Sequence, residues 1–346
     1  MQARDHVPVH NRSEPLTVTH YHRRFDDSYS SIEGLFAEIR SGMPPFINCK
    51  IVVAPFVSRG FWRRLANIIT APFYQSDVNH ITGDINYVSF LLSRKKTILT
   101  IHDCVVLERL SGLKKAIFFL FWYWLPEKRI GIITAVSHST KKELLRYLHC
   151  DPEKIRVIHN CISADFKPQA KVFNATRPVL LQIGTRYNKN LIRVAEALRD
   201  IPCHLRIIGV LNREQSAALS RFNIDYSAKA GITGQEMVRE YQDADMLVFV
   251  STYEGFGLPV AEANAVGRPV VTSNLLSMPE VAGTAACLVD PYSVPDIRKG
   301  ILSVLSDRDY REKLIADGYE NAKRFNAAII AGQYAGLYEE VYRNSF

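Results

Sequence analysis

Short runs of apolar, often β-branched residues alternate with longer amphipathic stretches along most of the chain. Val78–Ile81 and Met246–Phe249 have the length of single strands, whereas Ser139–Leu148 carries leucines at helical spacing on one face. This alternation predicts an α/β protein with largely parallel sheets. The predicted strands are Leu16–His20, Lys50–Val53, Val78–Ile81, Thr97–Ile101, Ile132–Val136, Ile155–Ile158, Val179–Ile183, His204–Ile208, Ile224–Tyr226, Met246–Phe249, Pro269–Thr272 and Ala286–Leu288.

The polar segment Ser163–Pro178 interrupts this alternation and is the best candidate for a linker. A chain of 346 residues is too long for one ordinary core, so two domains are expected. We assign residues 16–167 to the first and 168–327 to the second, with 1–15 as a loose leader and 328–346 as a final helix. Two such domains bind a ligand in the cleft between them, where strands end and helices begin.

Composition narrows the kinds of partner that the protein binds. The 47% of hydrophobic and 23% of charged residues are typical of a folded globular protein, and the net charge of +8 favours an anionic partner. Nucleic acid is not expected, because the sequence contains no RRM, KH or zinc-finger pattern. No stretch approaches the roughly 20 apolar residues of a membrane span, and the N-terminus lacks the apolar stretch of a signal peptide. A cytoplasmic location is therefore expected.

The segment Tyr253–Ala263 joins a predicted strand to a predicted helix and concentrates residues suited to an anionic sugar ligand. Gly255 and Gly257 free the backbone N–H groups to face a phosphate beside the positive end of the helix dipole. Glu254 and Glu262 bracket the turn, and a carboxylate accepts hydrogen bonds from vicinal hydroxyls. Glu262 alone could instead complement the helix dipole, but that role does not explain an acid beside two glycines.

A second strand end, Gln182–Leu191, combines a glycine with two cations. Gly184 gives the backbone room, and Arg186 and Lys189 would neutralise a diphosphate leaving group, which lowers the barrier to its departure. A solvated turn with two surface cations is the alternative.

In the first domain, the strand Thr97–Ile101 ends in His102 and Asp103, at the cleft edge of the predicted fold. This histidine can donate to a sugar hydroxyl or a phosphate. A His–Asp pair that only satisfies its own hydrogen bonds is the alternative.

Glu254–Ala263 resembles the signature E-G-[FL]-G-L-P-x-x-E-A of glycosyltransferase family four, the retaining, group 1-type enzymes of GT-B fold, and the likeness continues through Pro279–Val281 and Leu288–Pro291. The resemblance implies two Rossmann-like domains facing a central cleft, with a last helix that crosses back to the first domain. It also implies that the protein is a hexosyltransferase that uses a UDP- or GDP-sugar. The resemblance implies that His102 and Glu254 are catalytic. It also implies that the donor is bound by Gly184, Arg186, Lys189, Gly255, Phe256, Gly257, Leu258 and Glu262.

The resemblance also implies that no metal or other cofactor is needed, since GT-B enzymes generally bind their donor without one. Asp243 and Asp245 have the spacing of a DxD metal motif, but they lie where a helix ends and a buried strand begins. The alternatives to a transferase are a GT-B nucleotide-sugar epimerase, a phosphorylase-like enzyme and a non-catalytic sugar-binding protein.

The acceptor side departs from the family pattern, because Tyr21–Ile32 lacks the Gly-Gly loop that many members carry. Arg23, Ser30 and Ser31 are its candidate lining residues. Phe61–Ile69 and Ala116–Leu125 mix aromatic and aliphatic residues near basic ones, typical of either a buried helix or a membrane-surface contact. We therefore expect a cell-envelope polysaccharide or lipid-linked glycan as acceptor, and a peripheral location on the inner face of the membrane.

Overall fold

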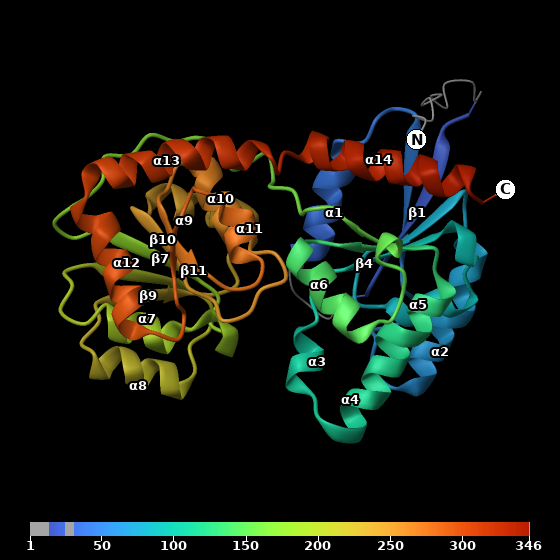
Figure 1. Ribbon diagram of the computed structural model, residues 1–346, viewed down its shortest axis with the longest axis horizontal. Helices are drawn as coiled ribbons and strands as arrows, with labels where there is room; N and C mark the ends of the chain where they lie inside the picture. Colours follow the sequence, from blue (N-terminus) through green and yellow to red (C-terminus); the bar gives the residue numbers. More distant parts are fainter. Residues whose placement is uncertain (1–13, 25–30, 346) are drawn as a thin grey trace.

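The computed structural model describes residues 14–24 and 31–345, which form two parallel sheets flanked by helices (Figure 1). The expected leader falls outside these residues except for positions 14 and 15, as does Ser30. No helix within the described residues is both long and apolar enough to traverse a bilayer.

The first sheet has the strand order β2-β1-β3-β4-β5-β6, and every adjacent pair is parallel. Its strands are β1 (Leu16–His22), β2 (Ile47–Val53), β3 (Val78–Ile81), β4 (Thr97–Ile101), β5 (Ile132–Ala135) and β6 (Ile155–Val157). Its α-helices are α1 (Ser31–Ser41), α2 (Phe61–Thr70), α3 (Val105–Arg109), α4 (Gly112–Phe119), α5 (Leu125–Arg129) and α6 (His138–Tyr147). Its shorter elements are the 3-10 helices η1 (Ala71–Tyr74), η2 (Asn86–Leu91), η3 (Arg94–Lys96) and η5 (Pro152–Lys154), and the π-helix η4 (Leu120–Trp124).

The second sheet has the order β12-β11-β10-β7-β8-β9, again with parallel neighbours throughout. The order reverses between β7 and β10, and ligands of such sheets bind beyond the carboxyl ends of the strands at this point. Its strands are β7 (Val179–Ile183), β8 (His204–Ile208), β9 (Tyr226–Lys229), β10 (Met246–Phe249), β11 (Val270–Ser273) and β12 (Cys287–Val289). Its helices are η6 (Tyr187–Lys189), α7 (Leu191–Ala197), α8 (Arg213–Arg221), α9 (Gly234–Asp243), α10 (Leu258–Val266), α11 (Met278–Ala282), α12 (Val294–Ser306) and α13 (Arg308–Lys323).

The predicted α/β organisation is confirmed, and the largest differences from the predicted strand bounds are in β9 and β2. β9 begins at Tyr226, because the Ile224 N–H still bonds to the Leu219 carbonyl and Asn223 has a φ of 51°, so this stretch closes α8 instead. β2 begins at Ile47, three residues early, because it pairs with β1 along the whole length of that strand.

The last helix, α14 (Ala327–Arg343), follows the second domain in sequence but lies against the first, beside α1 (Figure 1). Tyr334 and Tyr338 are buried in the same core as Phe36 of α1. The Tyr338 hydroxyl lies 3.0 Å from His20 Nε2 and 2.7 Å from His80 Nδ1, so α14 is tied to the sheet by polar as well as apolar contacts.

From the burial of His80 we expect the first domain to lose stability in acid. Its imidazole is buried and bonded, and burial lowers its pKa to about 3. The unfolded chain binds a proton near pH 6.5, whereas the folded chain does not until about pH 3. Stability therefore falls below about pH 6.5, by roughly 1.4 kcal/mol per pH unit for this residue.

Urea unfolding at about pH 7.5, 6.5 and 5.5 measures this slope through tryptophan fluorescence. The chain's three tryptophans, Trp62, Trp122 and Trp124, all lie in the first domain. His80→Gln should lower the starting stability but flatten the slope, and an unchanged slope would contradict the assignment.

Candidate functional site

A cavity of about 760 Å³ lies between the two domains, at the carboxyl ends of β4, β7 and β10. Nine of the ten residues predicted from the sequence line it: His102, Arg186, Lys189, Glu254, Gly255, Phe256, Gly257, Leu258 and Glu262. The first domain adds Arg23, Leu35, Glu38, Asp84 and Asp103 to the wall. The fold therefore gathers residues more than 150 positions apart around one space, as expected for a switch-point site.

Lys189 and Glu254 form the charged centre of the cavity. Lys189 Nζ lies 2.6 Å from Glu254 Oε1, and both side chains are largely buried. Asn188 donates to the same oxygen at 3.3 Å. Gly184 does not line the cavity: a Cβ there would lie 3.0 Å from Lys189 Cε, so the glycine makes room for the lysine stem.

Arg186 sits at the cavity wall with an exposed guanidinium, and within the described part of the chain it has no hydrogen-bond or ion-pair partner. The position of the Arg186 guanidinium therefore suits binding of a ligand phosphate better than a structural ion pair.

The loop that enters α10 exposes backbone to the cavity. Gly257 is the N-cap of α10 with a φ of 102°, which L side chains rarely adopt. The Phe256 ring is buried against His159 and Phe325, with centroids at 5.7 and 5.4 Å. Because this ring is held by packing, a ligand can meet only the backbone of Phe256 there.

At Gly255 the backbone of the second domain lies directly against the backbone of the first. A Cβ on Gly255 would lie 1.9 Å from the His102 carbonyl oxygen. Its own carbonyl accepts hydrogen bonds from Ser137 Oγ at 2.7 Å and Thr140 Oγ1 at 3.1 Å, at the start of α6. Neither of these two partners was predicted from the sequence.

His102 is oriented by its own domain. Nε2 lies 2.8 Å from the Thr82 carbonyl, which can only accept, so Nε2 carries a proton and Nδ1 is left for another contact. Asp103 accepts from the Val105 N–H instead, and burial raises the pKa of its carboxyl. The described structure thus shows no His102–Asp103 hydrogen bond, contrary to the alternative of a self-satisfied pair.

Glu262 faces the cavity from the first turns of α10, and the buried Tyr241 hydroxyl donates to its Oε2 at 2.6 Å. Burial raises the pKa of Glu262 to about 7, although the Tyr241 bond and Lys189 oppose the shift. Its contribution to stability is therefore complete below about pH 4.5 and lost as the pH rises through about 7.

The same shift predicts pH-dependent donor binding. If the ionised carboxylate accepts ribose hydroxyls, affinity for a nucleotide sugar should rise up to about tenfold between pH 6 and 8. A nucleotide sugar is the right probe, because its phosphates do not titrate in this range. Calorimetry on Glu262→Gln should give a flat profile; a profile as steep as wild type would place the titrating group elsewhere.

The start of α9 also lines the cavity, through Thr233 and Gly234, which are not among the site residues predicted from the sequence. Thr233 and Glu236 form a capping box, with each side chain bonded to the other's backbone N–H. The T-x-x-E spacing is the sequence signal of a helix N-terminus that could have marked these residues as candidates for the site.

A polar bridge beside the cavity joins the domains near the linker. Glu280 of α11 accepts from the N–H groups of His138 and Ser139 in α6, and from His159 Nε2 at 2.8 Å. Burial opposes ionisation, but these hydrogen bonds lower the pKa of Glu280. His159 thus takes part in holding the domains together.

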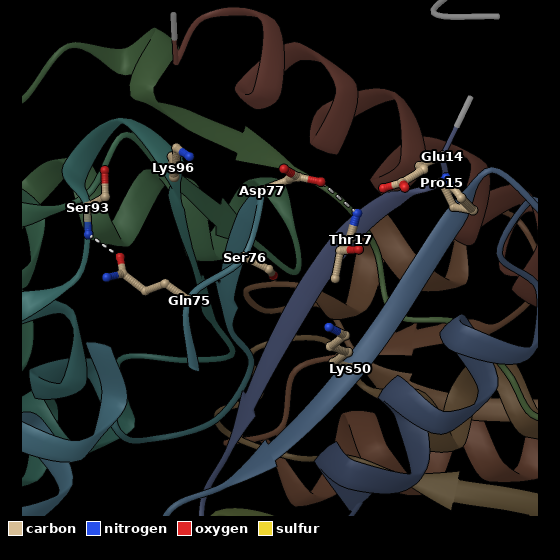
Figure 2. Close-up of a pocket in the computed structure, with 9 residues that line it drawn as sticks. All are labelled: Glu14, Pro15, Thr17, Lys50, Gln75, Ser76, Asp77, Ser93 and Lys96. Atoms are coloured by element: carbon tan, nitrogen blue, oxygen red, sulfur yellow. Dashed lines mark hydrogen bonds between the residues drawn. The ribbon is translucent and has the colours of Figure 1, made fainter. Parts of the chain in front are cut away.

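A second polar cavity, of about 650 Å³, lies at the amino ends of β1, β3 and β4 (Figure 2). Asp77 there accepts from the Thr17 N–H, and Gln75 accepts from the Ser93 N–H. It lies at the opposite edge of the sheet from the predicted site residues, where open α/β sheets do not bind their ligands.

Solved structures identify the architecture. Anabaena Alr3699/HepE in complex with UDP and glucose has a TM-score of 0.74 and 14% identity, over 94% of this chain and 100% of that one. WaaG, a glycosyltransferase involved in lipopolysaccharide biosynthesis, has a TM-score of 0.71 and 13% identity, over 93% and 99%. The predicted GT-B fold, two Rossmann-like domains facing a cleft, is thereby confirmed.

Curated relatives are similar over part of their length. O-antigen chain mannosyltransferase B of Escherichia coli is 29% identical over 217 residues, 56% of this chain and 57% of that protein. O-antigen chain mannosyltransferase RfbU of Salmonella typhimurium is 28% identical over 209 residues, 58% of each. Serotype-specific mannosyltransferase WbdA of Escherichia coli is 25% identical over 264 residues, 67% of this chain and 32% of that protein. The chain thus spans between a third and three fifths of these relatives.

Two family models divide the chain between them. The model described as Glycosyltransferase Family 4 matches residues 16–166, and the model described as Glycosyl transferases group 1 matches residues 163–321. The first match covers the domain that carries His102, and the second covers the domain that carries Lys189 and Glu254. The chain therefore belongs to the family 4, group 1-type glycosyltransferases.

Proposed function

We propose that this protein is a retaining hexosyltransferase that moves a sugar from a nucleoside diphosphate donor to a hydroxyl group of a glycan or lipid-linked acceptor. The observation that carries the proposal is the Lys189–Glu254 pair, set in the interdomain cavity at the switch point of the second sheet. A cation there is placed to receive a diphosphate, and a carboxylate to receive sugar hydroxyls.

The donor would bind mainly to the second domain. Glu262 would bind the ribose, and Glu254 and His102 would bind the sugar. The diphosphate would bind to the Gly255–Gly257 backbone and to Arg186 and Lys189. The fixed positive charges of Arg186 and Lys189 stabilise the negative charge that develops on the departing diphosphate. Since they do this task themselves, we expect neither a metal ion nor another cofactor to be required.

The anomeric configuration is retained if the acceptor hydroxyl attacks the anomeric carbon from the face that the diphosphate leaves. The bond from the anomeric carbon to the phosphate oxygen breaks, a bond to the acceptor oxygen forms, and the released phosphate oxygen takes the acceptor proton. His102, held by Thr82 through Nε2, would position the sugar during this step.

Nucleotide release from a panel of UDP- and GDP-sugars, with and without an envelope lipid extract, tests the proposal. Relatives named as mannosyltransferases make a mannose donor the first choice. Acceptor-dependent release of UDP or GDP is expected. Conversion of the donor into an isomeric sugar would indicate an epimerase, and binding without any turnover a sugar-binding protein; either result would reject the transferase.

Contact with the inner membrane surface belongs to the same proposal. Helix α2 and the α4–η4 segment expose apolar side chains beside basic ones, as an interfacial surface does. In α2, Phe61 and Trp62 are 69% and 77% exposed, next to Arg63; in α4, Leu113 is 76% exposed, next to Lys114. The segment Ala116–Leu125 is only partly buried, because Tyr123 lies inside while Ile117 is half exposed.

Sedimentation with vesicles tests this contact. Vesicles of phosphatidylcholine with about a third phosphatidylglycerol should bind the chain, more weakly at high salt. Phe61→Ser with Trp62→Ser should reduce binding at least several-fold. Val172→Ser with Val210→Ser removes two exposed apolar side chains from the second domain and serves as the control. Equal binding by both double variants would rule out α2 as the contact.

A further inference from the structure

Tyr253 connects the donor-binding loop of the second domain to the first domain. Its hydroxyl donates to Glu143 Oε2 of α6 at 2.9 Å and accepts from the Cys104 N–H at 3.0 Å. Its carbonyl accepts from Asn188 Nδ2 of the second domain at 2.8 Å. Tyr253 is therefore hydrogen-bonded to both domains, and it directly precedes Glu254, the carboxylate that we propose binds the sugar.

The polar contacts of α6 are made to the residues on both sides of Glu254. Ser137, Thr140 and Glu143 follow one another at spacings of three, which places them on one face at the start of α6. The first two donate to the carbonyl of the residue after Glu254, and the third accepts from the hydroxyl of the residue before it. This one face of α6 therefore fixes the backbone around Glu254 relative to the first domain.

The second bond of the Tyr253 hydroxyl reaches the strand end that carries His102. Cys104 follows His102 by two residues and is the N-cap of α3. Because Cys104 is buried, its N–H needs a partner inside the protein, and Tyr253 supplies one. Glu254 and His102, which we propose bind the donor sugar from opposite domains, are thus connected through Tyr253.

Glu143 depends on the same hydroxyl. Its side chain is buried, and Tyr253 supplies the one hydrogen bond that the described part of the chain gives to this carboxylate. Burial raises the pKa of Glu143, and the hydrogen bond from Tyr253 opposes that shift. A buried carboxylate that loses its donor is destabilised more than an exposed one, so the bond between Tyr253 and Glu143 is one that the folded protein strongly favours.

We infer that Tyr253 is a positioning residue for the proposed transfer: by joining Glu143 and Cys104 to the donor-binding loop, it sets the position of Glu254 relative to His102. The inference rests on the proposed function, because this position matters only if both groups hold the donor sugar. Tyr253 is not among the described residues that line the interdomain cavity, so it acts through Glu254 and does not touch the ligand. A displacement of about 1 Å between groups that hold a substrate costs on the order of 10² in rate.

Tyr253→Phe tests the inference, because it removes only the hydroxyl and keeps the ring. Turnover should fall at least about tenfold, since a hydrogen bond to a charged group is lost on the side of the first domain. Affinity for the nucleoside diphosphate should stay within about twofold of wild type, since that ligand would bind the second domain, whose bond to the Tyr253 carbonyl is intact. A merely structural role in folding the loop would lower affinity and turnover together.

Tyr147→Phe is the matched control. It also removes a hydroxyl that donates to a carboxylate, at 2.7 Å, but Tyr147 and its partner Glu108 both belong to the first domain. Turnover of this variant should stay within about twofold of wild type.

Variants of Glu143 test the partner of the Tyr253 hydroxyl. Glu143→Gln keeps an oxygen that can accept from Tyr253 and should retain most of the activity. Glu143→Ala removes the acceptor and should lose about as much turnover as Tyr253→Phe. The double variant with Tyr253→Phe should be no worse than either single one, because the effects of two residues in contact are not additive.

Hydrogen exchange in peptides that contain Cys104 measures the contact without any substrate. The Cys104 N–H, bonded to Tyr253 in the wild type, should exchange at least about tenfold faster in Tyr253→Phe and at the wild-type rate in Tyr147→Phe. Equal exchange in the wild type and Tyr253→Phe would overturn the inference, as would turnover within twofold of wild type or a loss of affinity as large as the loss of turnover.

Failure of the proposed function has a different signature. In that case no donor releases its nucleotide with any acceptor in the wild type, and the positioning role of Tyr253 is rejected with the function. The faster exchange of Cys104 in Tyr253→Phe would still be seen, because it depends only on the contact between the domains.

Discussion

Replacement of Lys189 by methionine is expected to lower the rate of acceptor-dependent nucleotide release about a thousandfold, with the chain still folded. Methionine preserves most of the stem that packs beside Gly184 and removes the charge that lies 2.6 Å from Glu254. A single fixed group aimed at developing charge in an active site contributes on the order of 10² to 10³ in rate, or about 3 to 4 kcal/mol. Glu254→Gln should cause a loss of similar size by weakening contact with the sugar.

The matched control is Lys229→Met, which also removes an ion-paired lysine of the second domain, one that lies 2.7 Å from Glu240. Its rate should stay within about twofold of wild type. The double variant of Lys189 and Glu254 should be little worse than either single one, because residues that act as a unit are not additive. If Lys189→Met retains a tenth of wild-type activity, the charge on Lys189 is not what drives departure.

The sequence predicted the strands that hold this site because they are buried and short. Residues Val78–Ile81, Thr97–Ile101 and Met246–Phe249 have the predicted bounds and are buried along their whole length. Met246–Phe249 is a continuous apolar run, as expected of a strand covered on both faces. The site residues followed, because strand ends in parallel sheets converge on one edge.

Contacts between the domains could not be predicted in the same way. The bond from Ser137 to the Gly255 carbonyl joins residues 118 positions apart, and neither residue carries a periodic signal for it. The same holds for Glu280 and His159, whose pairing depends on how closely α11 and α6 approach. Such pairs are set by tertiary packing, which local patterns do not encode.

The sequence also did not predict which side chains of an apolar segment are exposed. The run Ala116–Leu125 is equally apolar along its length, so the sequence could not say which side chains are inside. The structure breaks the run at the end of α4 and continues it as the π-helix η4, which turns Tyr123 inward and leaves Phe121 and Trp124 about two fifths exposed. A change of helix type redistributes the faces, and hydrophobic periodicity alone does not reveal it.

Gly255→Ala should lower turnover at least about a hundredfold without unfolding either domain. A Cβ at this position would lie 1.9 Å from the His102 carbonyl oxygen, and real Cβ atoms keep about 3 Å or more from such an atom, so the domains must separate by roughly 1 Å. A displacement of that size between the sugar-binding and diphosphate-binding groups costs on the order of 10² in rate. Separation would also lengthen the bonds from Ser137 and Thr140 to Gly255.

Gly336→Ala is the matched control, because a Cβ at Gly336 of α14 meets nothing within 4 Å. This change should leave turnover unchanged and slightly raise stability, since alanine favours a helix more than glycine does. Binding separates the two explanations for a loss in Gly255→Ala. If the domains cannot close, the nucleoside diphosphate still binds Glu262 and the second domain with nearly wild-type affinity while turnover falls. If affinity falls as much as turnover, Gly255 acts through the diphosphate alone, and its approach to His102 is not what catalysis requires.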